Sequence, residues 1–147
     1  MKENTNFKDI YLKWLNENIE QYKINKNLFR LTLPFLDRNN DHTEIFVQKI
    51  TDNSYRLSDD GNTLNELELS NFDIFSSQRR TDIFNNILNG HGIKKSENNE
   101  LYVECNFNNI ASKKHMLAQC MIKVSDLFNL SKTNVQSLFL EDVQNFL

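Results

Sequence analysis

The chain has 147 residues and a formal net charge of −3 at pH 7, and this length fits one folded domain. Hydrophobic residues make up 39% and charged residues 25%, proportions that exclude an intrinsically disordered chain. The acidic balance argues against nucleic-acid binding, because Lys and Arg supply most of that affinity by neutralising phosphates. No apolar run approaches the roughly 20 residues of a membrane span, and residues 1–9 lack the apolar region of a signal peptide. We therefore expect a cytoplasmic protein that binds no membrane.

The first third of the chain predicts a helix followed by three strands. Alternation then predicts strands over Leu28–Leu33, Ile45–Ile50 and Tyr55–Ser58, which form an antiparallel meander. Pro34 ends the regular part of the first of these strands. The apolar residues of the helix recur at three- and four-residue steps on one stripe, which we expect to pack on the sheet: Phe7, Ile10, Tyr11, Trp14, Leu15, Ile19 and Tyr22.

The remainder of the chain predicts helices, a hairpin and two further helices. Thr63 and Glu66 have the spacing of a capping box for a short helix. Ser76 or Ser77 caps the next helix, which ends at Gly90 or Gly92. A short strand near residue 93 and a strand over 101–105 form the hairpin, and helices follow over about 111–130 and from residue 134. We therefore predict one α+β domain over residues 1–147. Its apolar C-terminal helix docks on the core, mediates self-association, or leads into a longer architecture.

Acidic side chains gather in two predicted turns, before the second meander strand and after the third. Carboxylates with a His can hold a divalent metal ion, while Asp in turns more commonly bonds to its own backbone. The residues are Asp37, Arg38, Asp41, His42 and Glu44 in the first turn and Asp59 and Asp60 in the second. If the last two meander strands form a hairpin, both sets lie at the same end of the sheet.

A restriction-endonuclease-like core offers one test of the metal interpretation. Such a core begins with a helix and three strands, and it needs an Asp at the start of the second strand and an acid-x-Lys on the third. Asp41 fits the first requirement, but the third strand reads Tyr55-Arg56-Leu57-Ser58 and lacks the second. We therefore expect no bound metal and no cofactor, and keep a degenerate metal-dependent nucleic-acid enzyme as the alternative.

Nucleophilic catalysis has little support in the sequence. There is no Gly-x-Ser-x-Gly elbow and no phosphate-binding glycine loop. Cys105 and Cys120 fall on apolar stretches and are interpreted as reduced core residues, although a Cys–His pair with His91 or His115 is an alternative. The absence of C-x-x-C excludes a common zinc motif.

Arg79 and Arg80 stand out because they fall in the first turn of a predicted helix, where the helix dipole disfavours cations. An ion pair with Glu66 or Glu68 is one explanation, and an acidic partner is another.

Four stretches of sequence have a spacing that matches a known bacterial family. They are residues 32–41 (TLPFLDRNND), residues 57–61 (LSDDG), Arg79-Arg80 leading into residues 87–90 (ILNG), and residues 113–116 (KKHM). Together they resemble domain-of-unknown-function family 1828, over about residues 12–147. The resemblance implies low-GC Gram-positive bacteria, often prophages or other mobile elements, and longer members carry a further C-terminal domain. It implies no activity.

These observations lead to a non-enzymatic protein-interaction module as the predicted function. The resemblance adds that it is encoded by a prophage or other mobile element and acts on a host or phage protein, in defence or counter-defence. We expect the protein partner to dock on the two acidic turns and the Arg79-Arg80 helix start, which we hypothesise to form one surface.

Overall fold

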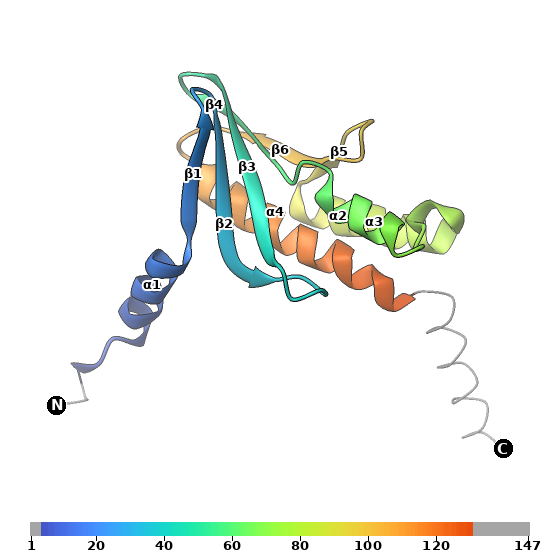
Figure 1. Ribbon diagram of the computed structural model, residues 1–147, viewed down its shortest axis with the longest axis horizontal. Coiled ribbons are helices and arrows are strands. Elements are labelled where there is room, and N and C mark those ends of the chain that lie inside the picture. The colour runs from blue at the N-terminus through green and yellow to red at the C-terminus, as the bar shows by residue number, and fades with distance from the viewer. Residues whose placement is uncertain (1–3, 131–147) are drawn as a thin grey trace.

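Within residues 4–130, the part of the chain that the computed structural model describes, six antiparallel strands form one sheet (Figure 1). The predicted hairpin adds its strands to the same sheet as the meander, and the fold is α+β, as predicted. The strands are β1 (Glu20–Asn25), β2 (Leu28–Leu36), β3 (His42–Thr51), β4 (Ser54–Ser58), β5 (Lys94–Lys95) and β6 (Leu101–Cys105), in the spatial order β1-β2-β3-β4-β6-β5.

One face of the sheet is buried under helices, because alternate residues of each strand point to the same side. Leu31 lies opposite Ile45, and Val47 lies opposite Leu57. The long helix α4 (Ile110–Ser125) crosses this face (Figure 1), while α2 (Asn62–Leu69) and α3 (Gln78–His91) pack against α4. Two short 3-10 helices, η2 (Ile74–Ser76) and η3 (Asp126–Leu130), complete this layer. The largest fully buried apolar side chains are Phe84, Leu33, Ile45, Leu57, Leu67, Leu101, Leu117 and Val124.

The opposite face of the sheet is not covered by a helix of the described residues. One of the cross-strand rows on this open face mixes aromatic and basic side chains. Its members, in order across the sheet, are Tyr22, Arg30, Phe46, Ser58, Tyr102 and Lys94. The arginines of this face are paired with carboxylates, Arg30 with Glu44 at 3.6 Å and Arg56 with Glu100 at 3.0 Å.

The first helix contradicts the prediction that its stripe packs on the sheet. Helix α1 (Phe7–Asn18) contains no buried residue, and Tyr11 and Trp14 are 54% and 47% exposed. It projects from the start of β1, and one extended residue, Ile19, joins the two elements (Figure 1). The predicted stripe was too long because Ile19 and Tyr22 fit helical spacing although they belong to an extended segment. Strand β1 was missed because all six of its residues are exposed, so it shows no apolar alternation.

The predicted strand end at Pro34 and the predicted helix caps agree only in part with the structure. Strand β2 continues past Pro34, but its register with β3 shifts between Thr32 and Leu36, as expected of a strand interrupted by proline. Ser77 caps α3 by accepting a hydrogen bond from the Arg80 N–H, and Gly92 ends it in the left-handed conformation. The capping box was wrong, because α2 begins after Gly61 and places Thr63 inside the helix.

The C-terminal part is confirmed as far as residue 130. Helix α4 and η3 together cover the predicted long helix. The last predicted helix, from residue 134, lies outside the described residues, so a single domain over 1–147 stays a prediction. Within residues 4–130 no helix is long and apolar enough to cross a membrane.

Candidate functional site

Asp37 stabilises the loop between β2 and β3 by hydrogen bonds to the loop backbone, as predicted for Asp in a turn. Its carboxylate accepts hydrogen bonds from the Asn39 N–H at 2.8 Å and from the Asp41 N–H at 3.1 Å. Its own N–H donates to the Asp41 carbonyl at 2.9 Å, and Asn40 takes a left-handed conformation at the tip. Asp37 is therefore needed to shape the loop, whatever else it binds.

The same loop contributes two carboxylates to an acidic pocket, which we define by Asp37, Asp41 and Glu66. One oxygen of each lies within 4.8 Å of the others. Glu66 comes from α2, on the far wall of a hollow of about 330 Å³. Burial, followed by the charges of Asp37 and Asp41, raises the pKa of the Glu66 carboxyl above its usual value. The hollow is also lined by His42, Thr43, Glu44, Asn62, Thr63, Met121, Ile122 and Ser125.

Three oxygen ligands of this kind suit a hard divalent cation or a basic side chain of another protein. The lining of the acidic pocket contains neither Lys nor Cys, so the described residues offer it no base of the acid-x-Lys type and no thiol nucleophile. Glu66 was not foreseen as a member, because 25 residues separate it from Asp41 and only the packing of α2 brings them together.

Arg38 holds its loop against the helical layer, and its charge partly opposes the rise in the pKa of Glu66. Its Nη2 donates to the Glu66 carbonyl at 3.2 Å and to Ser70 Oγ at 2.6 Å, and its guanidinium lies 4.4 Å from the centre of the Phe128 ring. These contacts give Arg38 a structural role.

Asp59 corrects the expectation that both acidic turns face a partner or a metal. Its side chain is 0% exposed. The carboxylate accepts hydrogen bonds from three backbone N–H groups, those of Gly61 at 2.8 Å, Thr63 at 3.1 Å and Leu101 at 2.9 Å. Burial raises the pKa of Asp59, although these hydrogen bonds oppose the rise. Asp59 thus joins β4, α2 and β6 in the interior and is inaccessible to a docking protein.

Asp60 is not part of the acidic pocket and lines a different hollow. It is exposed, with a left-handed backbone, and lines a groove of about 610 Å³ on the open sheet face together with Ile24, Phe46 and Arg56. The two acidic turns therefore do not converge as expected: Asp37 and Asp41 meet Glu66, while Asp59 and Asp60 lie elsewhere.

Arg79 and Arg80 have different surroundings although they are adjacent. Arg79 is exposed. Arg80 is half-buried, its Nη1 donates to the Asp73 carbonyl at 3.2 Å and to Ser76 Oγ at 3.3 Å, and its guanidinium lies 4.5 Å from the centre of the Phe72 ring. These contacts explain how a cation is tolerated in the first turn of α3.

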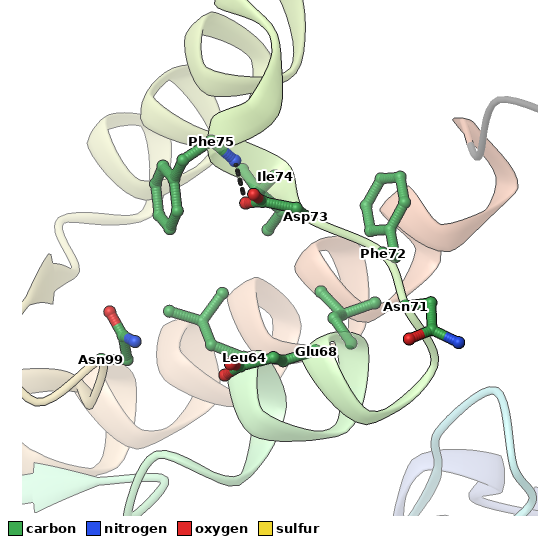
Figure 2. A pocket seen from close by; sticks show the side chains of 9 residues that line it. Leu64, Glu68, Asn71, Phe72, Asp73, Ile74, Phe75 and Asn99 are labelled. Carbon is green, nitrogen blue, oxygen red and sulfur yellow. Dashed lines mark hydrogen bonds between the residues drawn. The ribbon is translucent and has the colours of Figure 1, made fainter.

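A second hollow, next to Arg80, was not predicted. It has a volume of about 350 Å³ between α2 and the segment that leads into α3. Figure 2 shows Leu64 and Phe75 on opposite sides of it, and Asp73 accepting a hydrogen bond from the Phe75 N–H at 2.9 Å. The run of apolar residues Phe72, Ile74 and Phe75 between the helices was the available signal.

The cysteines agree with their interpretation as core residues. Cys105 and Cys120 are free and buried, and burial raises the pKa of both thiols, that of Cys120 to about 12. A thiol with such a pKa is not a nucleophile at neutral pH. His91 contacts the Ile87 carbonyl at 2.7 Å, and His115 contacts Gln119 at 3.1 Å.

Comparison with known proteins places this architecture in a family. The family model described as "Domain of unknown function DUF1828" matches residues 33–124, more than half of the chain. The chain belongs to this family. No curated protein and no solved structure matches the chain.

The DUF1828 match runs from within β2 to within α4 and divides the features described above into two groups. The acidic pocket, the Asp59 turn and the Arg79-Arg80 helix start all lie inside it. Helix α1 and strand β1 lie before it, so the projecting helix is an addition to the part of the chain that defines the match. The match is shorter than the resemblance over residues 12–147 suggested.

Proposed function

We propose that this DUF1828 protein is a non-enzymatic protein-interaction module whose main contact is the arm, defined as α1. The observation that carries the proposal is the unburied apolar stripe of the arm, in which Phe7 is 77% exposed and Ile10, Tyr11 and Trp14 are about half exposed. A contiguous exposed apolar patch of several hundred Å² commonly marks a place where another molecule binds. Trp and Tyr are also enriched among the residues that dominate binding energy.

Charge favours a protein over a membrane or a nucleic acid as the occupant of the arm. Lys8 and Lys13 are balanced by Asp9 and Glu17, so the helix carries no net charge. Helices that lie on membrane surfaces, and surfaces that bind phosphates, carry a basic excess. The chain as a whole is acidic, with a net charge of −3.

A second contact within the proposed function is the acidic pocket with its neighbours His42 and Glu44. Carboxylates that repel one another, as Asp37, Asp41 and Glu66 do, are stabilised by an incoming Lys or Arg. Asp60 and Arg79 remain exposed and available. Asp59, Arg38 and Arg80 make internal contacts and are left out of this surface. A role in host–phage conflict belongs to the same proposal and rests on the family resemblance. A cytoplasmic location also belongs to it and is supported by the two free, buried cysteines.

The proposal predicts that the arm is needed for capture and dispensable for folding. Tagged full-length chain and its Tyr11→Glu/Trp14→Glu variant would be compared by affinity capture from the source cell and mass spectrometry. We expect proteins that the wild type retains and the variant loses, while circular dichroism shows both proteins folded. Leu69→Glu is the matched control, because Leu69 is a 75% exposed apolar residue on α2. Identical captures by all three proteins would contradict the proposal.

A metal-dependent nucleic-acid enzyme is the second candidate function, and the convergence of Asp37, Asp41 and Glu66 favours it. The missing acid-x-Lys on β4 and the absence of Lys from the pocket lining count against it. Elemental analysis and Mn²⁺ titration of the purified chain test it directly. Stoichiometric metal that is lost in Asp41→Ala, together with cleavage of nucleic acid that depends on it, would reverse the order of the two functions.

A further inference from the structure

We propose that the partner of the arm is a second copy of this chain, and that the two copies pair through β1 and exchange their α1 helices. This inference rests on the proposed interaction function and names its partner. It starts from two surfaces of one molecule that lack a covering layer, the arm and the free edge of β1.

Strand β1 is a free edge of the sheet. Among residues 4–130 it is hydrogen-bonded to β2 alone, all six of its residues are exposed, and it contains no proline. The outward N–H and C=O groups of such a strand pair readily with another strand. The opposite edge, β5, has only two residues, Lys94 and Lys95, and offers no comparable length.

The junction between the arm and β1 keeps the arm from burying its apolar stripe against its own sheet. Helix α1 ends at Asn18 and β1 begins at Glu20, so Ile19 alone joins them. Ile19 is extended and packs against the core, which fixes the direction in which the helix leaves. A short, fixed junction of this kind favours exchange between identical chains over closure within one chain.

The surface that would receive the arm lies at the other end of the same strand. Ile24 near the end of β1 and Ile50 near the end of β3 are both about half exposed. The β1–β2 turn contacts β3 near this place, because the Lys49 N–H donates to the carbonyl of Asn27 in that turn at 2.7 Å, while β2 lies between the two strands themselves. Figure 1 shows α1 and this turn at opposite ends of β1.

A two-fold axis perpendicular to the sheet, placed between the Tyr22 residues of two copies, sets the start of one β1 strand beside the end of the other. It pairs the β1 strands antiparallel and sets each arm beside Ile24 and Ile50 of the second copy. Opposite residues are then Tyr22 with Tyr22, Gln21 with Lys23, and Glu20 with Ile24, so no like charges face each other. An axis through Lys23 would place two lysines opposite each other, which destabilises a strand pair. Both contacts are used twice, so the assembly closes at two copies.

The expected size of this interface is that of a stable dimer. Large side chains expose roughly 150–250 Å² each when free, so the exposed parts of Phe7, Ile10, Tyr11 and Trp14 amount to about 500 Å² per arm. The edge strand and the receiving residues add to this area, so that the interface approaches the roughly 800 Å² per copy that is standard for specific complexes.

The test measures the oligomeric state of the full chain by light scattering after gel filtration, at concentrations up to about 0.1 mM. The wild type should have the mass of two chains. The arm variant Tyr11→Glu/Trp14→Glu and the receiver variant Ile24→Lys/Ile50→Lys should each have the mass of one chain. Leu69→Glu should remain a dimer. Because none of these side chains is buried, circular dichroism should show all of them folded.

Mixing the two monomeric variants gives the sharpest result. A mixed dimer would join the intact arm of the receiver variant to the intact receiver of the arm variant, so one of the two contacts is complete. We expect partial recovery of the dimer in the mixture and none in either variant alone. Surfaces that associate non-specifically would show no such complementation.

Several results would overturn the inference. They are a monomeric wild type, a dimer that survives in the arm variant, a mixture that stays monomeric, or binding of the arm to vesicles of anionic lipid. If the wild type is monomeric and its arm still captures a different protein, the inference that the partner is a second copy is wrong, but the proposed function still holds. A monomeric wild type whose captures are unaffected by the arm substitutions overturns both.

Discussion

The Asp59 turn and the arm both depart from what the chemistry of their side chains suggests, because a charged residue is buried in the first and apolar residues are exposed in the second. Asp59 is a carboxylate in an Asp-Asp-Gly turn, yet it is fully buried. Trp14 belongs to an amphipathic stripe, yet about half of its surface is exposed. The difference lies in what each finds nearby: three backbone N–H groups point at Asp59, while no described sheet face or helix covers α1. Burial therefore follows the partners that the fold supplies.

The first prediction is that loss of Asp59 strongly destabilises the fold, by an amount comparable to the loss of a core aromatic side chain. In Asp59→Ala, the N–H groups of Gly61, Thr63 and Leu101 lose their acceptor inside the protein, and each such group costs about 1–3 kcal/mol. The desolvation cost of the carboxylate itself is also removed, so we expect a net loss of about 3 kcal/mol or more. Urea unfolding measures it. Asp60→Asn is the control, because Asp60 is exposed and Asn tolerates its left-handed backbone. Equal effects of both substitutions would contradict the structural role of Asp59.

The second prediction sets a core aromatic residue against the arm. Phe84 is buried on α3, so Phe84→Ala should lower the free energy of unfolding by about 3–5 kcal/mol. Trp14→Ala should change it by less than about 0.5 kcal/mol in dilute protein, where copies are apart. Both are measured by urea unfolding monitored by circular dichroism. A loss of several kcal/mol in Trp14→Ala would mean that the arm packs on its own domain.

Much of the fold could be predicted because its elements bury one face. Strands β3 and β4 and helices α3 and α4 have apolar residues at regular spacing, and all were anticipated within a few residues. Strand β1 has no buried residue and therefore left no pattern to detect. The arm was recognised as a helix, but periodicity shows only that a stripe exists and cannot show which molecule covers it.

The candidate site was predictable only in part, for a different reason. Asp37 and Asp41 stand four residues apart in one loop, so their proximity follows from the local turn. Glu66 joins them through the packing of α2, which no local pattern encodes. Asp59 was assigned to the surface because its turn chemistry is visible in the sequence, whereas the Leu101 N–H that it accepts from lies 42 residues away.

The third prediction separates the two adjacent arginines. Arg80→Ala removes hydrogen bonds to Asp73 and Ser76 and the contact with the Phe72 ring, and should cost about 1 kcal/mol. Arg79→Ala should cost less than about 0.5 kcal/mol, because Arg79 is exposed. Thermal unfolding of the two single variants measures the difference. If Arg79→Ala also abolishes capture of a partner while Arg80→Ala does not, Arg79 belongs to the docking surface.

The smallest effect concerns the acidic pocket, and its size depends on pH. The pKa of Glu66 is raised in the folded chain by burial and by Asp37 and Asp41. A raised pKa means that Glu66 favours the folded state below its unfolded pKa, and that this contribution is lost as the pH rises through the folded pKa. At neutral pH the charged Glu66 therefore destabilises the fold.

Glu66→Gln removes that charge and should stabilise the chain by a few tenths of a kcal/mol at pH 7, since the group is partly solvated. The gain should shrink as the pH falls through the raised pKa of Glu66, and it should vanish below the unfolded value, where Glu66 is neutral in both states. Urea unfolding at several pH values between 3 and 7 measures it, with Glu68→Gln on the exposed side of α2 as the control. Saturating Mn²⁺ distinguishes the two proposed functions, because a metal held by the three carboxylates would make Glu66→Gln the less stable protein at pH 7. An unchanged gain in the presence of Mn²⁺ leaves the acidic pocket as a surface for basic side chains of a protein.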